Sequence, residues 1–335
     1  GFYSNDIDLS VIAIEIYRLA EMPVLLAIPL FTFAGYLISE SGAPRRLVRI
    51  SNALLGWLPG GLAMISLAAC ALFTAFTGAS GVTIIALGAL LYPALKEAGY
   101  KESFNLGLVT SAGSLGLLFA PSLPLILYGV VAEVSIDSLF LGGILPGTLM
   151  VVMLAAYSFW VNRHNRAEPG KFSWKEVRES MWEAKWELPL PVVVLGGIYG
   201  GVFAVSEAAA VTALYVLIID VLIMREVSLK QLPRIMQESM VLVGGILIIL
   251  AVSLASTNYM IDSGVPDKLF AMVESMVDTP FGFMVALLIF LLVLGAILDI
   301  FSAIVLVVPL ILPVAQGFGI DPVHLGIVFL AAMQL

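Results

Sequence analysis

One carboxylate stands alone in a long apolar stretch of the sequence. Asp299 is the only acidic residue between Pro280 and Pro313, and an ionised side chain in the middle of a bilayer costs of order 2.5–3.5 kcal/mol on insertion scales. It lies in the segment Gly295–Ser302, which resembles the turn of a helical hairpin. The sequence therefore predicts a functional carboxylate. The alternative is a hairpin cap held by local N–H groups, and the two roles are compatible.

A second turn joins two short apolar arms. Thr77-Gly78-Ala79-Ser80-Gly81 lies between arms 61–76 and 82–95, which are about 24 and 21 Å long at roughly 1.5 Å per residue, short for a hydrocarbon core of about 30 Å. A turn at this depth must be buried in protein or line a cavity. We expect a re-entrant hairpin. Two full crossings joined by a small-residue turn are the alternative.

The segment 103–132 contains signals for a broken helix. Ser111, Ser114 and two glycines precede Phe119-Ala120-Pro121-Ser122-Leu123-Pro124, and two prolines three residues apart remove backbone donors and disfavour a continuous helix. We expect a break near 119–122, with freed carbonyls that can bind a cation and N–H groups that can bind an anion. A simple structural kink is the alternative.

Composition sets the class of protein. Of 335 residues, 61% are hydrophobic and 12% are charged, about half the charged share of a soluble domain. Apolar runs long enough to span a bilayer lie at 22–39, 103–132, 136–161, 188–224, 239–257 and 280–316. We expect a polytopic, all-α membrane protein that binds no nucleic acid.

Little in the sequence supports enzymatic chemistry. His164, His324 and the single cysteine, Cys70, are isolated, so no transition-metal site or organic cofactor is expected. Motifs for nucleotide binding and nucleophilic catalysis are missing from this sequence. Transport energy would therefore come from an ion gradient or from another chain.

Basic residues indicate the orientation. Segments 40–60, 96–102, 162–187 and 225–238 hold fourteen of the sixteen Lys and Arg residues, and such segments face the cytoplasm. Following the chain under this assignment, the crossing at 22–39 runs inward, whereas the crossing at 239–257 runs outward.

Two parts of the sequence echo each other. Ser41-Gly42-Ala43-Pro44 recurs as Ser263-Gly264-Val265-Pro266, and each copy follows a crossing and precedes a hairpin. Because the crossings run in opposite directions, the sequence predicts inverted-topology repeats with two re-entrant helical hairpins and broken helices. That architecture is typical of secondary transporters.

The remaining charged residues have simpler interpretations. Glu207 is expected to be a helix N-terminal acid with Ser206 as the cap, and a ligand role is the alternative. Asp220 is expected to snorkel from a helix end. The segments 45–58, 162–187 and 264–277 look amphipathic and are expected to lie along the membrane interface.

These elements predict five regions. The range 1–60 holds scaffold helices and the interfacial arm of repeat 1, and 61–135 holds hairpin 1 and the first broken helix. Connecting helices with a cytoplasmic interfacial loop occupy 136–238, the scaffold helix and arm of repeat 2 occupy 239–279, and hairpin 2 with the start of the second broken helix occupies 280–335.

Five motifs in order resemble a known family. The runs 77–81, 113–122, 207–210, 295–302 and 319–326 are together similar to the large membrane subunit of tripartite ATP-independent periplasmic (TRAP) transporters, over essentially the whole sequence. The resemblance implies a Na⁺-driven importer of organic acids such as C4-dicarboxylates or sialic acids, working by an elevator mechanism in the bacterial or archaeal inner membrane. It also implies two partners, a small four-helix membrane subunit and a periplasmic substrate-binding protein.

The resemblance also implies roles for particular residues. The first sodium site would be formed by Thr77, Gly78, Ser80, Gly81, Gly113, Gly116 and Pro121. The second would be formed by Gly295, Asp299 and Ser302. Substrate contacts would come from Ser80, Ser111, Ser114, Ser122 and Asp299. The family's second broken-helix motif is expected after Leu335, so the sequence is interpreted as a fragment.

Two other functions remain open. One is a stand-alone ion-coupled anion carrier of similar architecture, which would need no partner. The other is an intramembrane enzyme using Asp299, which would need a second membrane carboxylate or a nucleophile–base pair at matching depth, and Asp220 near a helix end is a poor match.

Overall fold

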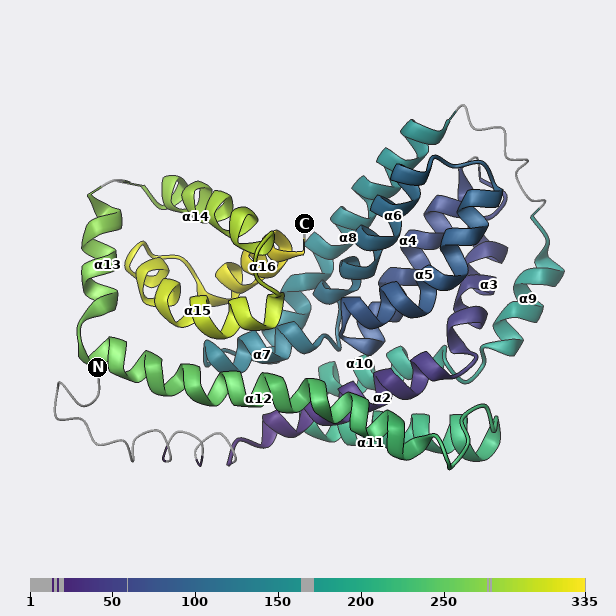
Figure 1. Ribbon diagram of the computed structural model, residues 1–335, viewed down its shortest axis with the longest axis horizontal. Helices are drawn as coiled ribbons and strands as arrows, with labels where there is room; N and C mark the ends of the chain where they lie inside the picture. Colours follow the sequence, from purple (N-terminus) through teal and green to yellow (C-terminus); the bar gives the residue numbers. More distant parts are fainter. Residues whose placement is uncertain are drawn as a thin grey trace.

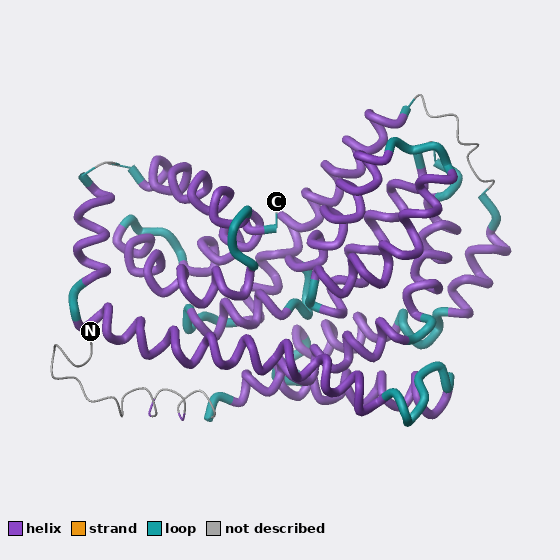
Figure 2. The backbone as a smooth tube through the Cα atoms, viewed as in Figure 1, coloured by secondary structure: helices purple, strands orange, loops and turns teal. Residues whose placement is uncertain are grey.

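The computed structural model describes residues 14, 17, 21–58, 60–163, 172–275, 277 and 279–334. Figure 2 shows helices and loops throughout this part of the chain. Five of its helices are long and apolar enough to cross a membrane, or six if one bent pair is counted as a single span. An all-helical polytopic membrane protein is confirmed. The expectations for residues 1–13 and for His164 fall outside the described residues.

Three lengthwise helices pack side by side. In Figure 1, α2, α11 and α12 run along the long axis, and α2 packs against both of the others. Buried alanines on α2 and α11, such as Ala34 and Ala209, allow their backbones to approach closely. The three helices are α2 (Ala27–Glu40), α11 (Val205–Leu217) and α12 (Leu232–Asp262). The elements next to them in the chain are η2 (Pro23–Leu26), α10 (Pro189–Tyr199) and the π-helical turn η4 (Ile218–Ile223).

Two expectations for this region are wrong. The expected loop 225–238 ends early, because α12 already begins at Leu232 with a proline in its first turn, where a missing N–H costs nothing. Ser206 is also not a cap. Ala204 is the N-cap of α11, and its backbone N–H donates to Glu207 Oε2 over 2.9 Å, so Glu207 is a helix N-terminal acid as expected.

Two helix pairs turn back on themselves at the expected places. α4 (Gly61–Thr77) and α5 (Ser80–Glu97) are joined at residues 78–79, where Gly78 has a φ of 63° that favours glycine. α14 (Pro280–Gly295) and α15 (Ile300–Gly317) are joined at residues 296–299. Short turns with helix caps therefore stand at both predicted positions.

The segment 102–131 is broken as the prolines predicted. α6 (Glu102–Leu115) tightens into the 3₁₀ turn η3 (Gly116–Leu118), and α7 (Leu123–Val131) then leaves at 49°. Residues 119–122 form the break. Pro124 is tolerated because it lies in the first turn of α7.

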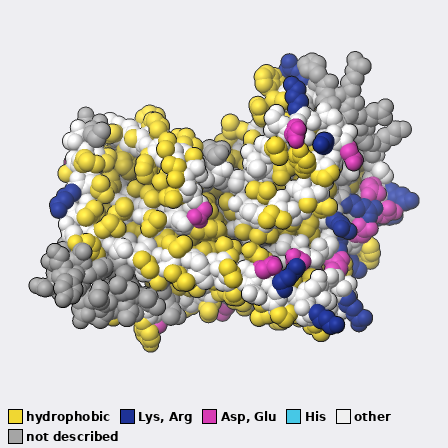
Figure 3. All heavy atoms as spheres, viewed as in Figure 1, with side chains coloured by type: hydrophobic (Ala, Val, Ile, Leu, Met, Phe, Trp, Pro, Cys, Tyr) yellow, Lys and Arg dark blue, Asp and Glu magenta, His cyan; other side chains and the backbone are white. Residues whose placement is uncertain are grey.

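Three amphipathic helices lie across the ends of the lengthwise helices. Figure 1 shows α3 (Ala43–Leu55) and α9 (Trp174–Glu183) at the right end and α13 (Val265–Glu274) at the left end. Lys and Arg side chains gather mainly at the right end of the surface in Figure 3, and hydrophobic side chains cover much of the rest. Two further helices, α8 (Ile136–Asn162) and α16 (Pro322–Met333), pack against each other.

Candidate functional site

A cluster of buried oxygen atoms lies at the turn of hairpin α4–α5. Three threonine side chains, Thr74, Thr77 and Thr83, are each no more than 1% exposed. The hydroxyl of Thr74 lies 2.7 Å from the hydroxyl of Thr83 and 2.8 Å from the carbonyl oxygen of Gly113. The Thr77 hydroxyl lies 3.3 Å from that of Thr83, and both approach the carbonyl oxygen of Ala79 at 3.4–3.5 Å.

The cluster has more lone pairs than protons. Five oxygens make five close contacts, yet three hydroxyls supply only three protons, and a carbonyl supplies none. The Gly113 carbonyl is available because it lies in the last turn of α6, where carbonyls lose their helical partners. Three hydroxyls and two carbonyls are the kind of ligands that hard cations prefer.

Close packing fixes the geometry of this cluster. A Cβ atom added at Gly113 would lie 2.5 Å from Ile84 Cγ1, and one added at Gly116 would lie 2.5 Å from Thr74 Cβ and 2.6 Å from the Ala75 backbone nitrogen. Only glycine lets α6 approach the hairpin this closely. Gly113 and Gly116 therefore shape the cluster, and their role as sodium-site residues stays a prediction.

The hairpin turn also meets the helix break. A Cβ atom at Gly78 would lie 3.0 Å from the backbone nitrogen of Leu123, the first residue of α7. Ser122, the N-cap of α7, is fully buried, and its Oγ has no hydrogen-bond partner among the described residues. Pro121 is buried in the same break, after a cis Ala120–Pro121 peptide bond. An unpartnered buried hydroxyl beside a helix N-terminus is suited to contact an ion or an anionic group.

Not every predicted residue joins this cluster. The Ser80 carbonyl lies against Gly113, and the Ser80 side chain is half-buried. Gly81 and Ser111 are exposed, and nothing lies within 4 Å of a Cβ atom built at Gly81. Ser114 bonds to the carbonyl oxygen of Gln334 over 3.0 Å, so it connects α6 to the end of α16.

Asp299 is a cap in this structure. Its Oδ2 accepts hydrogen bonds from the backbone N–H groups of Phe301 and Ser302, each at 3.0 Å, and its Oδ1 accepts from the Ser302 hydroxyl at 2.6 Å. The side chain is exposed at the turn before α15. Gly295, at the other side of this turn, packs near Met333 of α16. The local cap role is therefore present, and the carboxylate remains accessible.

Sequence reasoning missed Thr74 and Thr83. Each is a single hydroxyl residue inside an apolar helix, which is common and carries no special signal. Their spacing across the turn, three residues before Thr77 and six after it, places all three hydroxyls on facing surfaces of the two arms. That spacing was the only available clue.

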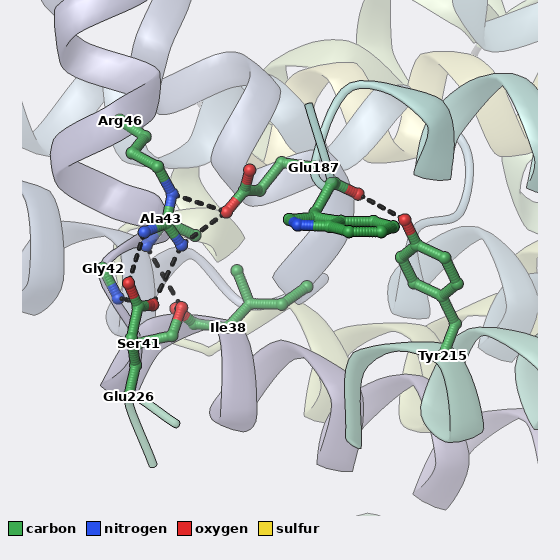
Figure 4. Close-up of polar contacts among 9 residues, drawn as sticks. Ile38, Ser41, Gly42, Ala43, Arg46, Glu187, Tyr215 and Glu226 are labelled. Atoms are coloured by element: carbon green, nitrogen blue, oxygen red, sulfur yellow. Dashed lines mark hydrogen bonds and ion pairs between the residues drawn. The ribbon is translucent and has the colours of Figure 1, made fainter. Parts of the chain in front are cut away.

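A second polar cluster lies at the α3 end of the molecule, far from the predicted site residues in sequence. Figure 4 shows Arg46 of α3 between Glu187 and Glu226. The guanidinium bonds to Glu226 at 2.5 and 2.9 Å and to Glu187 Oε1 from Nε at 2.7 Å, and Glu226 also accepts from the Gly42 N–H at 2.7 Å. The hydrogen bonds from the Arg46 guanidinium are the main cause that holds the pKa of the Glu226 carboxyl below its ordinary value. The cluster anchors the arm α3 to two loops.

Asp220 does not snorkel. It is 4% exposed within η4, and its Oδ2 has no partner among the described residues. The π-helical turn carries it inward beside the pocket formed by Ala43, Glu187 and Tyr215. The position of Asp220 near a helix end did not predict its burial, because the extra residue of the π turn changes the direction of the side chain.

A family model described as "Tripartite ATP-independent periplasmic transporter, DctM component" matches residues 2–335. The chain belongs to this family. Its members are transporters rather than enzymes, so the intramembrane enzyme is not supported. TRAP transporters use a small membrane subunit and a periplasmic binding protein.

Individual relatives agree with this family. The chain is 34% identical over 313 residues to the isethionate TRAP transporter permease protein DctMQ of Oleidesulfovibrio alaskensis, covering 93% of the chain and 49% of that relative. It is 33% identical over 326 residues to the C4-dicarboxylate TRAP transporter large permease protein DctM of Pseudomonas aeruginosa, covering 97% and 76%. It is 35% identical over 304 residues to the ectoine/5-hydroxyectoine large permease protein UehC of Ruegeria pomeroyi, covering 90% and 71%. The chain thus spans about half of the first relative and about three quarters of the other two.

Proposed function

We propose that this DctM-family protein is the membrane subunit of a Na⁺-coupled importer of organic acids. A periplasmic binding protein would deliver the substrate, and a small membrane subunit would complete the transporter in the bacterial inner membrane. The observation that carries the proposal is the buried oxygen cluster of Thr74, Thr77, Thr83 and the Gly113 and Ala79 carbonyls. It offers ligands for a small cation next to a helix break.

The charge distribution supports an ion-assisted mode of anion binding. The turns 77–81 and 295–302 and the break 119–122 contain no Lys or Arg. A carboxylate substrate would therefore be held by the N-terminus of α7 with Ser122, by hydroxyls, and by bound Na⁺. In this arrangement substrate and sodium bind together, because the charge of each lowers the electrostatic cost of binding the other. Coupling follows from the shared site.

The arrangement of the arms supports inverted repeats. Each Ser-Gly-x-Pro segment leads from a lengthwise helix into an amphipathic helix, α2 into α3 and α12 into α13, and the two amphipathic helices lie at opposite ends in Figure 1. We propose that α4–α7 and α14–α16 move together as the transport domain against a scaffold that includes α2, α11 and α12. The hydroxyl of Ser253 on α12 bonds to the carbonyl oxygen of Val305 on α15 over 2.5 Å, and this contact would change during an elevator movement.

Reconstitution tests the proposal. Proteoliposomes would hold the full-length protein with its small subunit, and the binding protein would be added outside with a panel of labelled C4-dicarboxylates and other organic acids. We expect that at least one of these acids is taken up, and that its uptake requires the full-length protein, the small subunit and the binding protein together. Uptake that is unchanged when the small subunit and the binding protein are omitted would favour the stand-alone carrier instead.

A further inference from the structure

The short helix α9 presents three chemically different faces. Its buried face carries Val177 and Ser180, and its C-cap residue Ala184 is buried as well. Its acidic face carries Glu176, Glu179 and Glu183, which pair with Arg49 of α3. Its outward face carries Trp174, Lys175, Arg178, Met181 and Trp182, which line one shallow surface pocket together with Val177. The glutamates of α9 thus turn toward Arg49, although their side chains remain 45–49% exposed, while its cations and indoles face outward.

The outward face is strongly exposed. Trp174 is 77% exposed and Trp182 is 70% exposed. Lys175 is 78% exposed, with one loose contact to Glu179 at 3.9 Å. Lys185, just beyond the helix, lies 4.7 Å from the ring centre of Trp182 and 5.5 Å from that of Trp186. Large exposed indoles beside cations are typical of the level of the lipid headgroups.

Four of the five tryptophans lie on this face or are connected to it by ring contacts. The sequence contains five tryptophans; they lie after α3, near the end of α8, on α9 and just after α9, at positions 57, 160, 174, 182 and 186. Two aromatic contacts connect part of this set, since Phe172 lies 6.1 Å from Trp57 and 5.3 Å from Trp174 between ring centres. A second cation, Arg163, lies 5.7 Å from the Trp160 ring. Phe172 thus connects Trp57, just after α3, with Trp174 of α9, and α3 and α9 lie beside each other in Figure 1.

We propose that the outward face of α9 is a binding site for anionic phospholipids of the cytoplasmic leaflet. The cations Lys175, Arg178 and Lys185 contact the lipid phosphate, whose negative charge no cationic headgroup offsets, and the indoles of Trp174 and Trp182 lie among the glycerol and upper acyl groups. Arg49 offsets one of the three glutamate charges of α9, and the three cations of the outward face outnumber the two charges that remain. The site does not depend on transport, so it stands or falls separately from the proposed sodium coupling.

The choice of a lipid over a protein partner rests on this mixture of groups. A partner helix inside the bilayer would require an apolar surface, such as the exposed residues of α8 and α12. Anionic headgroups satisfy the cations and the indoles at the same time, which is the arrangement of an amphipathic interfacial helix.

The test compares two triple variants of the full-length protein with its small subunit. One variant removes the α9 charges (Lys175→Gln, Arg178→Gln and Lys185→Gln), and the control removes three other exposed charges from the predicted cytoplasmic side (Lys96→Gln, Lys101→Gln and Lys230→Gln). Native mass spectrometry would count bound lipid during titration with phosphatidylglycerol or phosphatidylcholine. Gel filtration and the copurified small subunit would report folding and assembly.

The proposal predicts preferential binding of phosphatidylglycerol by the wild type and by the control variant. The α9 variant should bind it at least about tenfold more weakly, given about 1 kcal/mol for each basic residue at a membrane surface. A Lys175→Arg, Lys185→Arg variant should keep wild-type binding. The proposal would be overturned if the wild type bound phosphatidylglycerol and phosphatidylcholine equally, or if the α9 variant bound phosphatidylglycerol as tightly as the wild type. It would also be overturned if inorganic phosphate competed as well as the lipid, or if the α9 variant lost the small subunit while its lipid binding stayed unchanged.

Discussion

The hydroxyl of Thr74 lies 2.8 Å from the carbonyl oxygen of Gly113, so the hairpin α4–α5 is hydrogen-bonded to the last turn of α6 just before that helix breaks. Thr83 lies on the other side of the same hydroxyl, at 2.7 Å. Because the single proton of Thr74 can bond to the Gly113 carbonyl, the Thr83 hydroxyl supplies the proton between the two threonines. The three hydroxyls and two carbonyls keep more lone pairs than their three protons occupy. A cation at this position would bind the surplus lone pairs, which makes the Thr74 hydroxyl the most direct probe of the proposed sodium site.

Replacing Thr74 with valine should weaken sodium-dependent transport. Valine keeps the shape of the side chain and removes one ligand, so the sodium concentration for half-maximal uptake should rise by about tenfold or more, given about 1.5–3 kcal/mol for a hydrogen bond or contact to a charged group. The matched control is Thr32→Val. Thr32 is equally buried and bonds only to its own helix, at Ile28. An equal loss in both variants would point to folding rather than to ion binding.

Alanine at Gly116 should disrupt the hairpin contact. The added Cβ atom would collide with the α4 backbone at Ala75 and Ala71, and such overpacking costs about 1–3 kcal/mol. A lower thermal midpoint is therefore expected. Gly107→Ala on the preceding helix α6 is the control, because nothing lies within 4 Å of a Cβ atom there. Equal midpoints for the two variants would contradict the close approach of α6 and α4.

Two substitutions separate the roles of Asp299. Asp299→Asn keeps an oxygen for the N–H groups of Phe301 and Ser302 but removes the charge, whereas Asp299→Ala also removes the cap, at a cost of about 1 kcal/mol. We expect both to reduce sodium-dependent uptake and only the alanine variant to lower stability. Asp321 caps α16 through Val323 and His324 in the same way. Asp321→Asn should therefore leave uptake unchanged, and wild-type uptake by Asp299→Asn would remove Asp299 from the ion site.

Removing Arg46 should destabilise the α3 arm. Arg46→Gln leaves the carboxylates of Glu187 and Glu226 without their cation, and these side chains are 12% and 25% exposed. We expect a loss of about 2 kcal/mol, less than for a fully buried pair. Arg49→Gln breaks pairs that are 36–49% exposed and should change the thermal midpoint much less. Similar shifts for both variants would argue against the buried character of the Arg46 cluster.

The same cluster predicts a pH dependence. The pKa of Glu226 is lowered from an ordinary value of 4.5 by its hydrogen bond to Arg46. A lowered pKa in the folded state adds stability above the unfolded pKa and loses it as the pH falls through the folded pKa. The wild type should therefore lose part of its thermal stability below about pH 4.5. Glu226→Gln should lack this component, and identical acid profiles for the two proteins would exclude Glu226 as its source.

Local sequence signals predicted the backbone well and the side-chain clusters poorly. Gly78 and the prolines around residue 122 mark a turn and a break through their own conformational limits, so their positions could be predicted without tertiary information. The meeting of Thr74 with Gly113, and of Arg46 with residues 187 and 226, depends on packing between distant segments. No spacing along the chain encodes such contacts.

Two charged residues show the same limit. Asp299 and Asp220 are both carboxylates in apolar surroundings, and the sequence ranked Asp299 as functional and Asp220 as a snorkelling residue. The structure buries Asp220 and exposes Asp299 as a helix cap. A π-helical turn and a hairpin turn decide these outcomes, and neither changes the hydrophobic pattern.

Sodium-driven uptake tests the central claim most directly. Proteoliposomes with the full-length protein, its small subunit and the binding protein would receive an inward Na⁺ gradient or an equal K⁺ gradient, with labelled substrate outside. The account predicts concentrative uptake with Na⁺ only, strongly reduced in Thr74→Val and preserved in Thr32→Val. Equal uptake in the two gradients, or wild-type sodium dependence in Thr74→Val, would contradict a sodium site at the hairpin α4–α5.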